Sequence, residues 1–206
     1  LTTTFLASKC KKIISPAMNT AMFENQITQN NIAKLKEYGI DVIEPQSGLL
    51  ACGDTGTGKM PEPGYLFDVI EREIAREKDM LGKKVLVTAG ATMEALDPVR
   101  FLTNHSSGKM GFAIAKEAML RGAEVTVVKA NTTAEIPNFV NVVEVSSAGD
   151  MFNAVKAVSN QQDIIVKAAA VADYTPESYV DSKIKKKDGD LSIALKRTKD
   201  ILKYLG

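Results

Sequence analysis

The sequence predicts an α/β fold in which helices flank parallel sheets. Residues 83–129 open with the apolar run 85–87, continue through a helix at about 107–121 and close with a second apolar run at 125–128. Residues 12–43 repeat this pattern of strand, helix and strand, and residues 163–171 read as a further buried strand. A strand–helix–strand unit implies two parallel strands joined by a right-handed crossover, so parallel sheets are expected.

Composition restricts the class of protein further. The chain has 206 residues, of which 45% are hydrophobic and 25% charged, enough for one large or two small globular domains. A net charge of +1 gives no argument for nucleic acid or a membrane surface as partner. We find no membrane-length apolar run and no signal peptide, so a cytoplasmic location is expected. The first residue is Leu1, within a pattern already under way, which indicates a fragment.

The first part of the chain is expected to hold a small parallel pair and a long loop. Strands are predicted at 12–15 and 41–43, with a helix at 25–38 whose Ile32 and Leu35 face inward. The glycine-rich stretch 47–64 has no periodicity and could be a functional loop or a surface hairpin. An amphipathic helix at 65–81 follows, so we predict domains at 1–80 and 81–206. Cys10 and Cys52 have neither zinc nor disulfide spacing.

The loop between residues 90 and 109 is the strongest ligand-binding candidate. It lacks the G-x-G-x-x-G turn of dinucleotide-binding proteins, but Ser106, Ser107, Gly108 and Lys109 precede a helix. Free N–H groups, hydroxyls and a lysine at a helix start suit a polyphosphate. An ordinary helix cap, with glycines for tight packing, explains the same residues. The helix itself is predicted to bury the following side chains: Met110, Ala113, Ile114, Ala118 and Met119.

Further elements are expected towards the end of the chain. A strand at 140–145 precedes a helix that begins at Ser147, with Asp150 completing a capping pattern. The strand 163–171 contains small residues that would let a ligand approach the backbone. A strand at 191–195 and a helix at 200–205 come last. The lysine-rich run from Lys183 to Lys187 would by itself be a solvated loop.

Three strings in the second part resemble a known family. LVTAGATMEALDPVRFLTNHSSGKMGFAIA, KAAAVADYTP and KIKKK are similar to the nucleotide-binding half of phosphopantothenate:cysteine ligase, one domain of a bifunctional bacterial coenzyme A biosynthesis protein. The resemblance implies a Rossmann-like ligase portion that uses CTP, Mg²⁺, 4'-phosphopantothenate and cysteine, and that forms dimers. It leaves the metal ligands unassigned.

The ligase resemblance also implies site residues. Arg100 and Asn104 match residues that position the acyl intermediate, and Lys183 matches the lysine that neutralises the α-phosphate. The remaining nucleotide contacts implied by the match are Ser106, Ser107, Gly108, Lys167, Ala168, Ala169 and Asp173. Lys167 departs from the pattern, because a small residue is expected there.

PAMN and LACGDTGTGKM resemble the second half of the flavin-dependent phosphopantothenoylcysteine decarboxylase family, which implies a flavodoxin-like flavoprotein portion that binds FMN and forms trimers. Cys52 matches the proton donor, Asn19 the residue that holds the substrate carboxylate or amide, and Met22 the pocket wall. The family's flavin pocket and catalytic histidine come from the half preceding residue 1, and His105 cannot replace that histidine. This chain alone is therefore expected to lack decarboxylase activity.

The sequence allows two other classes of function. Tyr179 and Lys183 form a Y-x-x-x-K pair, the catalytic pair of NADP-dependent short-chain dehydrogenases. That pair requires a helix to place both side chains on one face, and residues 176–190 show no helical apolar period. The other alternative is a flavin-binding or oligomerisation module without catalysis.

Overall fold

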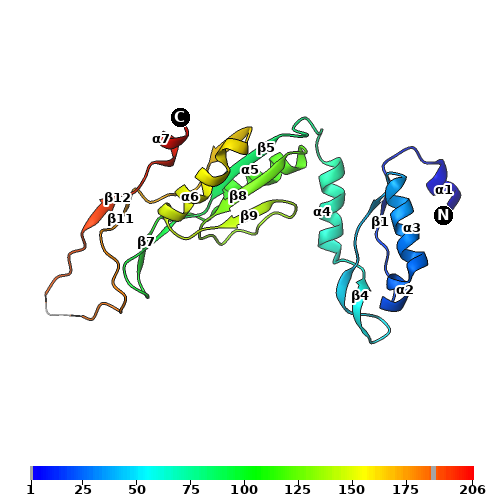
Figure 1. Cartoon of the computed structure of the whole chain (residues 1–206), viewed down its shortest axis with the longest axis horizontal. Coiled ribbons are helices and arrows are strands. Elements are labelled where there is room, and N and C mark those ends of the chain that lie inside the picture. Colours follow the sequence, from blue (N-terminus) through cyan, green and yellow to red (C-terminus); the bar gives the residue numbers. More distant parts are fainter. Residues whose placement is uncertain (1, 187–188) are drawn as a thin grey trace. The chain divides into compact units, whose positions relative to one another are not determined.

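The computed structural model describes residues 2–186 and 189–206 (Figure 1). These residues separate into two units, one ending at Val69 and the other spanning Ile70–Gly206. The boundary falls inside helix α4 (Pro63–Ile74), about ten residues before the boundary predicted at 80/81. Lys187, which belongs to the lysine-rich run, lies outside the described residues.

The first unit contains a parallel strand pair and a hairpin. Strand β1 (Ile13–Ile14) pairs in parallel with β2 (Asp41–Val42), and helices α2 (Thr20–Glu24) and α3 (Gln26–Glu37) lie between them in the chain. A short helix, α1 (Thr2–Ala7), precedes them. The glycine-rich stretch forms an antiparallel hairpin of β3 (Gln46–Leu49) and β4 (Thr55–Lys59), so the hairpin interpretation is confirmed.

Helix α4 is shorter than predicted. It ends at Ile74 instead of continuing to residue 81, and Ile74 is 78% exposed rather than part of a buried stripe. The residues beyond it bond to Leu120 and Arg121, more than 40 positions later, instead of to their own helix. Lys78 Nζ donates to the Leu120 carbonyl at 2.6 Å, and Asp79 pairs with the Arg121 guanidinium at 2.5 Å. The backbone is engaged in the same way, because the Met80 N–H donates to the Arg121 carbonyl at 3.0 Å instead of to a helical partner.

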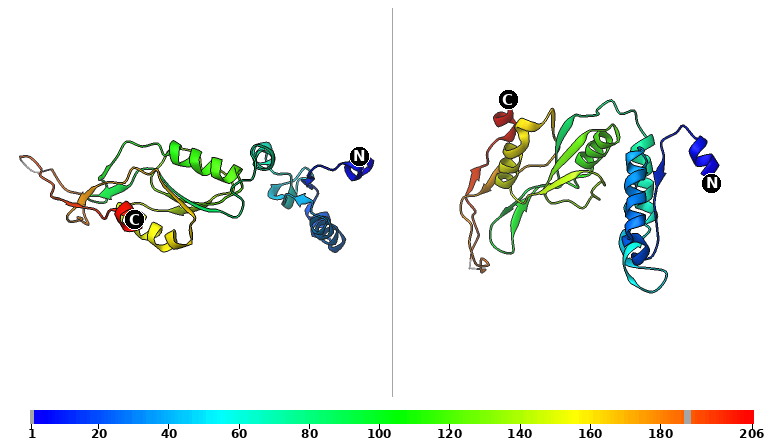
Figure 2. Two further views of the ribbon diagram at one scale, coloured as in Figure 1. Left: turned by 90° about the horizontal axis from the view of Figure 1, so that it is seen from above. Right: turned by 45° about the vertical axis from the view of Figure 1, so that its right-hand side comes forward.

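The second unit is built on a four-stranded parallel sheet in the order β10–β5–β8–β9 (Figure 1). The strands are β5 (Lys84–Ala89), β8 (Glu124–Lys129), β9 (Asn141–Glu144) and β10 (Ile164–Lys167). Helix α5 (Lys109–Leu120) covers one face, and α6 (Ala148–Val158), followed by a 3₁₀ turn (Ser159–Gln161), covers the other (Figure 2). The predicted α/β class with a parallel sheet is confirmed.

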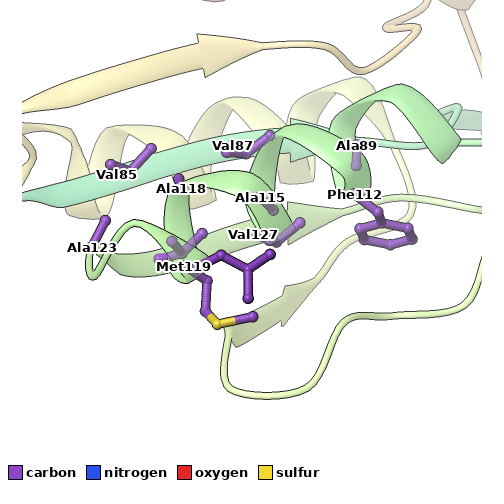
Figure 3. Close-up of a cluster of buried hydrophobic side chains, with 11 residues drawn as sticks. Val85, Val87, Ala89, Phe112, Ala115, Ala118, Met119, Ala123 and Val127 are labelled. Carbon is purple, nitrogen blue, oxygen red and sulfur yellow. The ribbon is translucent and has the colours of Figure 1, made fainter. Parts of the chain in front are cut away.

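Each face of the sheet has its own core. Val85, Val87 and Ala89 of β5 pack with Phe112 and Ala115 of α5 (Figure 3). Leu86, on the opposite face of the same strand, is fully buried in a second cluster with residues of α6 and with Ile201. Side chains alternate between the two faces of a strand, so a continuous apolar run supplies both clusters.

The structure corrects the predicted buried face of α5. Phe112 and Ala115 are buried, whereas Met110 is 66% exposed and Ala113 is also exposed. The helix begins only at Lys109, after Gly108 in a left-handed conformation with φ +75°. The inward stripe therefore follows Gly111, Phe112, Ala115, Ala118 and Met119.

Two strand predictions near the end of the chain also need correction. The strand expected at 163–171 ends at Lys167, and it is a half-buried edge strand because β10 has a neighbour on one side only. The strand expected at 191–195 is β12 (Leu195–Arg197), paired with β11 (Tyr174–Pro176). Helix α7 (Ile201–Leu205) forms as predicted, with Asp200 as its N-cap. Across residues 2–186 and 189–206, no helix has the length and apolar character needed to cross a membrane.

Candidate functional site

In the first unit, Asn19 and Cys52 line one cavity of about 500 Å³. Asn19 caps α2, because its Oδ1 accepts a bond from the Met22 N–H at 2.8 Å. Only the amide nitrogen of Asn19 is then left to donate to a ligand. Met22 is 56% exposed and is not among the residues lining the cavity, so its predicted role gains no support.

Gly58 allows the hairpin to approach the turn that carries Asn19. Its φ is +141°, and a Cβ there would lie 2.0 Å from the Met18 carbonyl oxygen. The Met18 N–H donates to the Gly58 carbonyl at 3.0 Å, which joins the two segments directly. Asn19 and Cys52 therefore reach the same cavity through a contact that only glycine permits.

Cys52 lies exposed in the turn between β3 and β4. Its Sγ donates to Asp54 Oδ2 at 3.6 Å, and the turn is closed by a 2.8 Å bond from the Leu50 N–H to the Asp54 carbonyl. Cys10 is also exposed, but its Sγ lies 3.5 Å from Ser8 Oγ and it is not among the residues lining the cavity. Of the two thiols, only Cys52 is thus placed beside Asn19.

In the second unit, the predicted residues gather near the junction of β5 and β10. The connection from β5 leads to β8 on one side, whereas β10 adds on the other side, so strand order reverses here. Such a switch point, at the carboxyl ends of the strands, is where open α/β sheets bind ligands. Ala91, just beyond β5, bridges to both Asn131 and Ala170.

Two buried threonines hold the segment that follows β10. The Ala169 N–H donates to Thr88 Oγ1 at 3.2 Å, and the Ala172 N–H donates to Thr92 Oγ1 at 3.0 Å. Both threonines are fully buried. Sequence reasoning missed them, because Thr88 within an apolar strand looks like any other β-branched core residue, and Thr92 in the following loop has no distinguishing pattern. The backbone of residues 168–172 is therefore set by β5 and its loop.

The start of α5 is packed closely against the sheet. A Cβ on Gly108 would lie 2.5 Å from Thr132 Oγ1, and one on Gly111 would lie 2.7 Å from the Ala89 Cβ. Ser106 Oγ accepts from the Gly108 N–H at 3.4 Å, and Ser107 Oγ accepts from the Lys109 N–H at 3.5 Å. The glycines thus have a packing role, and the long serine bonds leave the N–H groups of the first turn weakly held.

Asn104 connects the loop before α5 to the switch point. Its Nδ2 lies 3.5 Å from the carbonyl oxygens of both Ala170 and Val171. Lys167 and Asp173 line a cavity of about 390 Å³ together with Arg197, Lys199 and Asp200. Two residues predicted from separate positions in one motif therefore share a cavity, and three of its lining side chains are cationic.

Arg100 and Lys183 form a separate group. Arg100 Nη1 donates to the Ile184 carbonyl at 3.1 Å and lies 3.3 Å from Asp97 Oδ2. Lys183 lines a cavity of about 670 Å³ with Leu96, Val180 and Ile184, and is not among the residues lining the Lys167–Asp173 cavity. The predicted ligase residues thus do not form one group, because Lys183 lines a different cavity from Lys167 and Asp173.

Asp97 is the residue of this region to which sequence reasoning gave no role. Its side chain is fully buried although it carries a charge. The Ile184 N–H is the main reason that the pKa of Asp97 lies below its ordinary value of 3.8, with the N–H groups of Val99 and Arg100 adding to the effect and burial opposing it. The signal in the sequence was Asp97-Pro98, which is typical of a turn in which the aspartate accepts backbone bonds.

The dehydrogenase alternative is contradicted by the backbone. Tyr179 and Lys183 lie in a segment whose described residues, 177–186, contain no helix, and Tyr179 is 53% exposed. The two side chains therefore lack the shared helical face that their chemistry needs. Among residues 2–186 and 189–206, no group of three His, Cys, Asp or Glu side chains is placed to hold a metal ion.

Comparison with known proteins agrees with the resemblance found in the sequence. Residues 80–206 match the family model "DNA/pantothenate metabolism flavoprotein C-terminal domain", and residues 1–75 match the flavoprotein family model. The chain is 44% identical over its full length to the "Coenzyme A biosynthesis bifunctional protein CoaBC" of Bacillus subtilis, and covers 52% of that protein. It spans about half the length of the curated relatives it matches.

Solved structures show the same relationship. A crystal structure of the C-terminal domain of a coenzyme A biosynthesis bifunctional protein is 48% identical, with a TM-score of 0.53 over 61% of this chain and 59% of that chain. The DNA/pantothenate metabolism flavoprotein from Streptococcus pneumoniae is 25% identical, with a TM-score of 0.54 over 60% of this chain and 64% of that chain. The chain therefore belongs to the DNA/pantothenate metabolism flavoprotein family and is homologous to the bifunctional proteins of coenzyme A biosynthesis.

Proposed function

We propose that this chain contributes to two consecutive reactions of coenzyme A biosynthesis. Residues 81–206 would supply the nucleotide-binding part of a phosphopantothenate:cysteine ligase, and residues 1–80 the later part of a flavin-dependent decarboxylase domain. The homology to bifunctional relatives supports the pair of activities. The observation that carries the proposal is that the candidate residues share cavities: Asn19 with Cys52, from two separate motifs, and Lys167 with Asp173, from two positions of one motif.

The ligase reaction would proceed in two steps. A carboxylate oxygen of 4'-phosphopantothenate attacks the α-phosphorus of CTP, the bond to the β-phosphate breaks, and pyrophosphate leaves. The cysteine amine then attacks the acyl carbon, an amide forms, and CMP leaves as the proton of the amine is lost to solvent. Activation replaces a poor leaving group with a nucleotide, so positioning and charge neutralisation are the protein's main tasks.

Each ligase residue has a proposed task in this scheme. Asn104, anchored beside the Ala170 carbonyl, would hold the acyl intermediate with Arg100, and Lys183 would neutralise the α-phosphate. Ser106, Ser107 and Gly108 would meet phosphate at the start of α5. The backbone at Ala168 and Ala169 would contact the base, and Asp173 the ribose or base. Lys167 faces the same cavity as Asp173, where its charge suits an anionic ligand.

The cavity lined by Lys167 and Asp173 does not suit the implied Mg²⁺ as a resident ion. Asp173 and Asp200 line the same cavity, but Lys167, Arg197 and Lys199 line it too, so cationic side chains outnumber carboxylates. Mg²⁺ commonly arrives with substrate phosphates and keeps several waters.

The Asn19–Cys52 cavity does not by itself suit the FMN that the flavoprotein family implies. Among the described residues that line the Asn19–Cys52 cavity, Lys59 carries the only charge, and it pairs with Glu62 at 2.7 Å. That lining offers no unpaired cationic side chain for a flavin phosphate. Asn19 would donate its amide N–H to the substrate carboxylate or amide, and the Cys52 thiol would deliver a proton to the carbon of an enethiolate product.

The assembly and location implied by the resemblance stay predictions. We expect trimers of the decarboxylase portion, dimers of the ligase portion and a cytoplasmic location. Sedimentation of the natural protein that carries this chain would test the first two.

Nucleotide binding by the purified chain tests the ligase assignment. Calorimetric titration with CTP, ATP and NADPH is expected to show binding of CTP and no binding of NADPH. In the natural protein that carries this chain, Asn104→Asp should still release pyrophosphate and retain acyl-cytidylate, because the lost donor serves the second step. Lys183→Gln should lose pyrophosphate release. Binding of NADPH without CTP would reject the assignment.

A matched pair of thiol variants tests the decarboxylase assignment. In the same natural protein, Cys52→Ser should still release CO₂ but accumulate the oxidised enethiol product, since loss of the carboxylate precedes the proton transfer. Cys10→Ser is the control, because Cys10 does not line the cavity. A normal yield of the reduced aminothiol from Cys52→Ser would exclude the proposed role.

A further inference from the structure

We propose that Asp97 is a positioning residue that holds the lysine-bearing segment at Lys183 in place for the triphosphate. This inference rests on the proposed function, which makes Lys183 a phosphate contact. It assigns a role to a buried carboxylate that touches no proposed ligand.

The Asp97 carboxylate is surrounded by hydrogen-bond donors. Oδ1 accepts from the N–H groups of Val99 and Arg100, each at 2.8 Å. Oδ2 accepts from the Ile184 N–H at 3.0 Å, and the Arg100 guanidinium lies 3.3 Å from it. The side chain is fully buried. Every one of these partners is a donor, so both oxygens of the residue at position 97 must be able to accept hydrogen bonds.

Both backbone groups of Ile184 form hydrogen bonds to the turn that carries Asp97. The Ile184 N–H donates to Asp97 Oδ2, and Arg100 Nη1 donates to the Ile184 carbonyl at 3.1 Å. A third bond, from the Val180 N–H to the Leu96 carbonyl at 3.1 Å, lies four residues earlier. Residues 180–184 are thus fastened at three points to the turn 96–100. We call these three bonds the Ile184 clamp.

The clamp lies between two exposed lysines. Ile184 is half-buried, whereas Lys183 and Lys185 on either side of it are exposed. The clamp therefore fixes the backbone between two lysines and leaves both ammonium groups in solvent. Long lysine side chains lose conformational freedom when they bind phosphate, and a fixed backbone reduces what must still be ordered. Asp97 would act on binding through the segment rather than by touching the nucleotide.

The chemistry of Asp97 suggests the decisive variant. Asp97→Asn keeps size but replaces one acceptor oxygen with an NH₂ group. In either orientation of the amide, that NH₂ faces at least one N–H donor, so part of the clamp or of the turn must break. We expect about tenfold weaker CTP binding by the chain, and faster tryptic cleavage after Lys183 and Lys185.

A second variant protects the test against simple misfolding. Ile184→Pro removes the N–H that donates to Asp97 without altering the buried carboxylate. Ile184→Ala keeps that N–H and is the matched control. Trypsin does not cut a Lys–Pro bond, so cleavage is compared after Lys185. There Ile184→Pro should reproduce the faster cleavage, and it should also weaken CTP binding, whereas Ile184→Ala should change both less. Asp150→Asn alters a carboxylate that also accepts backbone bonds but caps α6, so it should leave both unchanged.

The coupling between Asp97 and Lys183 separates positioning from general stability. Lys183→Gln should weaken CTP binding in the otherwise unaltered chain, but add little in the Asp97→Asn background. Equal effects of Lys183→Gln in both backgrounds, or unchanged cleavage in Asp97→Asn and Ile184→Pro, would overturn the inference. If Lys183→Gln leaves CTP binding unchanged while the clamp variants still accelerate cleavage, the proposed phosphate contact fails and Asp97 is left with a structural role only, which also overturns positioning.

Discussion

The two units bury their apolar side chains in different ways. The unit Ile70–Gly206 closes a core on both faces of a four-stranded sheet. The described residues up to Val69 form only two-stranded pairings, and four of their apolar side chains are buried, namely Ile32, Ile40, Leu50 and Val69. Two-stranded pieces have little stability of their own, so local backbone geometry matters more in the first unit and core volume matters more in the second.

The largest effect is expected from a core truncation in the second unit. Leu86 is fully buried on the face of the sheet that α6 covers. Leu86→Ala should lower the free energy of unfolding of this unit by about 2–5 kcal/mol, through lost burial and the cavity that remains. Urea unfolding followed by circular dichroism measures the change. A loss below about 1 kcal/mol would mean that this core is not the main source of stability.

A backbone variant probes the first unit in the corresponding way. Gly58→Ala places a Cβ where the Met18 carbonyl stands, at a φ that side chains rarely adopt. We expect a cost of roughly 1–3 kcal/mol and displacement of the hairpin from the turn that carries Asn19. Faster alkylation of Cys52 by iodoacetamide would report the displacement. Gly64→Ala is the control, since nothing lies within 4 Å of its added Cβ; equal behaviour of the two variants would contradict the argument.

A helix cap in the second unit offers a smaller effect. Ser147 and Asp150 form a reciprocal capping box at the start of α6, with the Asp150 N–H donating to Ser147 Oγ at 3.1 Å. Ser147→Ala should cost about 1 kcal/mol, because one N–H of the first turn loses its partner. Thermal unfolding measures it. Ser147→Asp should recover part of the loss, and failure to recover would point to a cause other than capping.

The same cap predicts a dependence on pH. Bonds from the backbone N–H and then the hydroxyl of Ser147 hold the pKa of Asp150 below its ordinary value of 3.8. A lowered pKa stabilises the folded state fully above the unfolded pKa, and this stabilisation is lost as the pH falls through the folded pKa. The difference in unfolding free energy between the unaltered chain and Asp150→Asn should therefore be constant near neutral pH and vanish in acid. Acid titration of both proteins in urea checks this.

Local patterns predicted the elements that depend on near neighbours. The capping pattern at Ser147, the glycine stop after α5 and the apolar runs of β5 and β8 all act within a few residues, and each appears in the structure. The motifs also placed Asn19 with Cys52, and Lys167 with Asp173. The elements were predictable because residue type and local backbone are closely connected at turns and strand ends, whereas the roles of these four site residues stay predictions.

The features that were missed depend on distant partners. The end of α4 is decided by bonds to residues about 40 positions later, such as Lys78 to Leu120. The edge position of β10 follows from strand order, which periodicity does not contain. Asp97 meets Ile184 from 87 positions away, and no pattern at either position indicates the other. Burial of a charged group became visible only once both segments were in place.

The strand order also has a consequence for how the second unit folds. Val85 pairs with Val125, 40 residues later, but its other neighbour is Ile164, 79 residues later. Closing the longer loop costs more chain entropy, and Ile164 leaves the ribosome after the other three strands. The β5–β8–β9 sheet can therefore assemble first, with β10 docking onto an already formed edge. The junction of β5 and β10, where ligand binding is proposed, would then be the last part of the sheet to come into existence during synthesis.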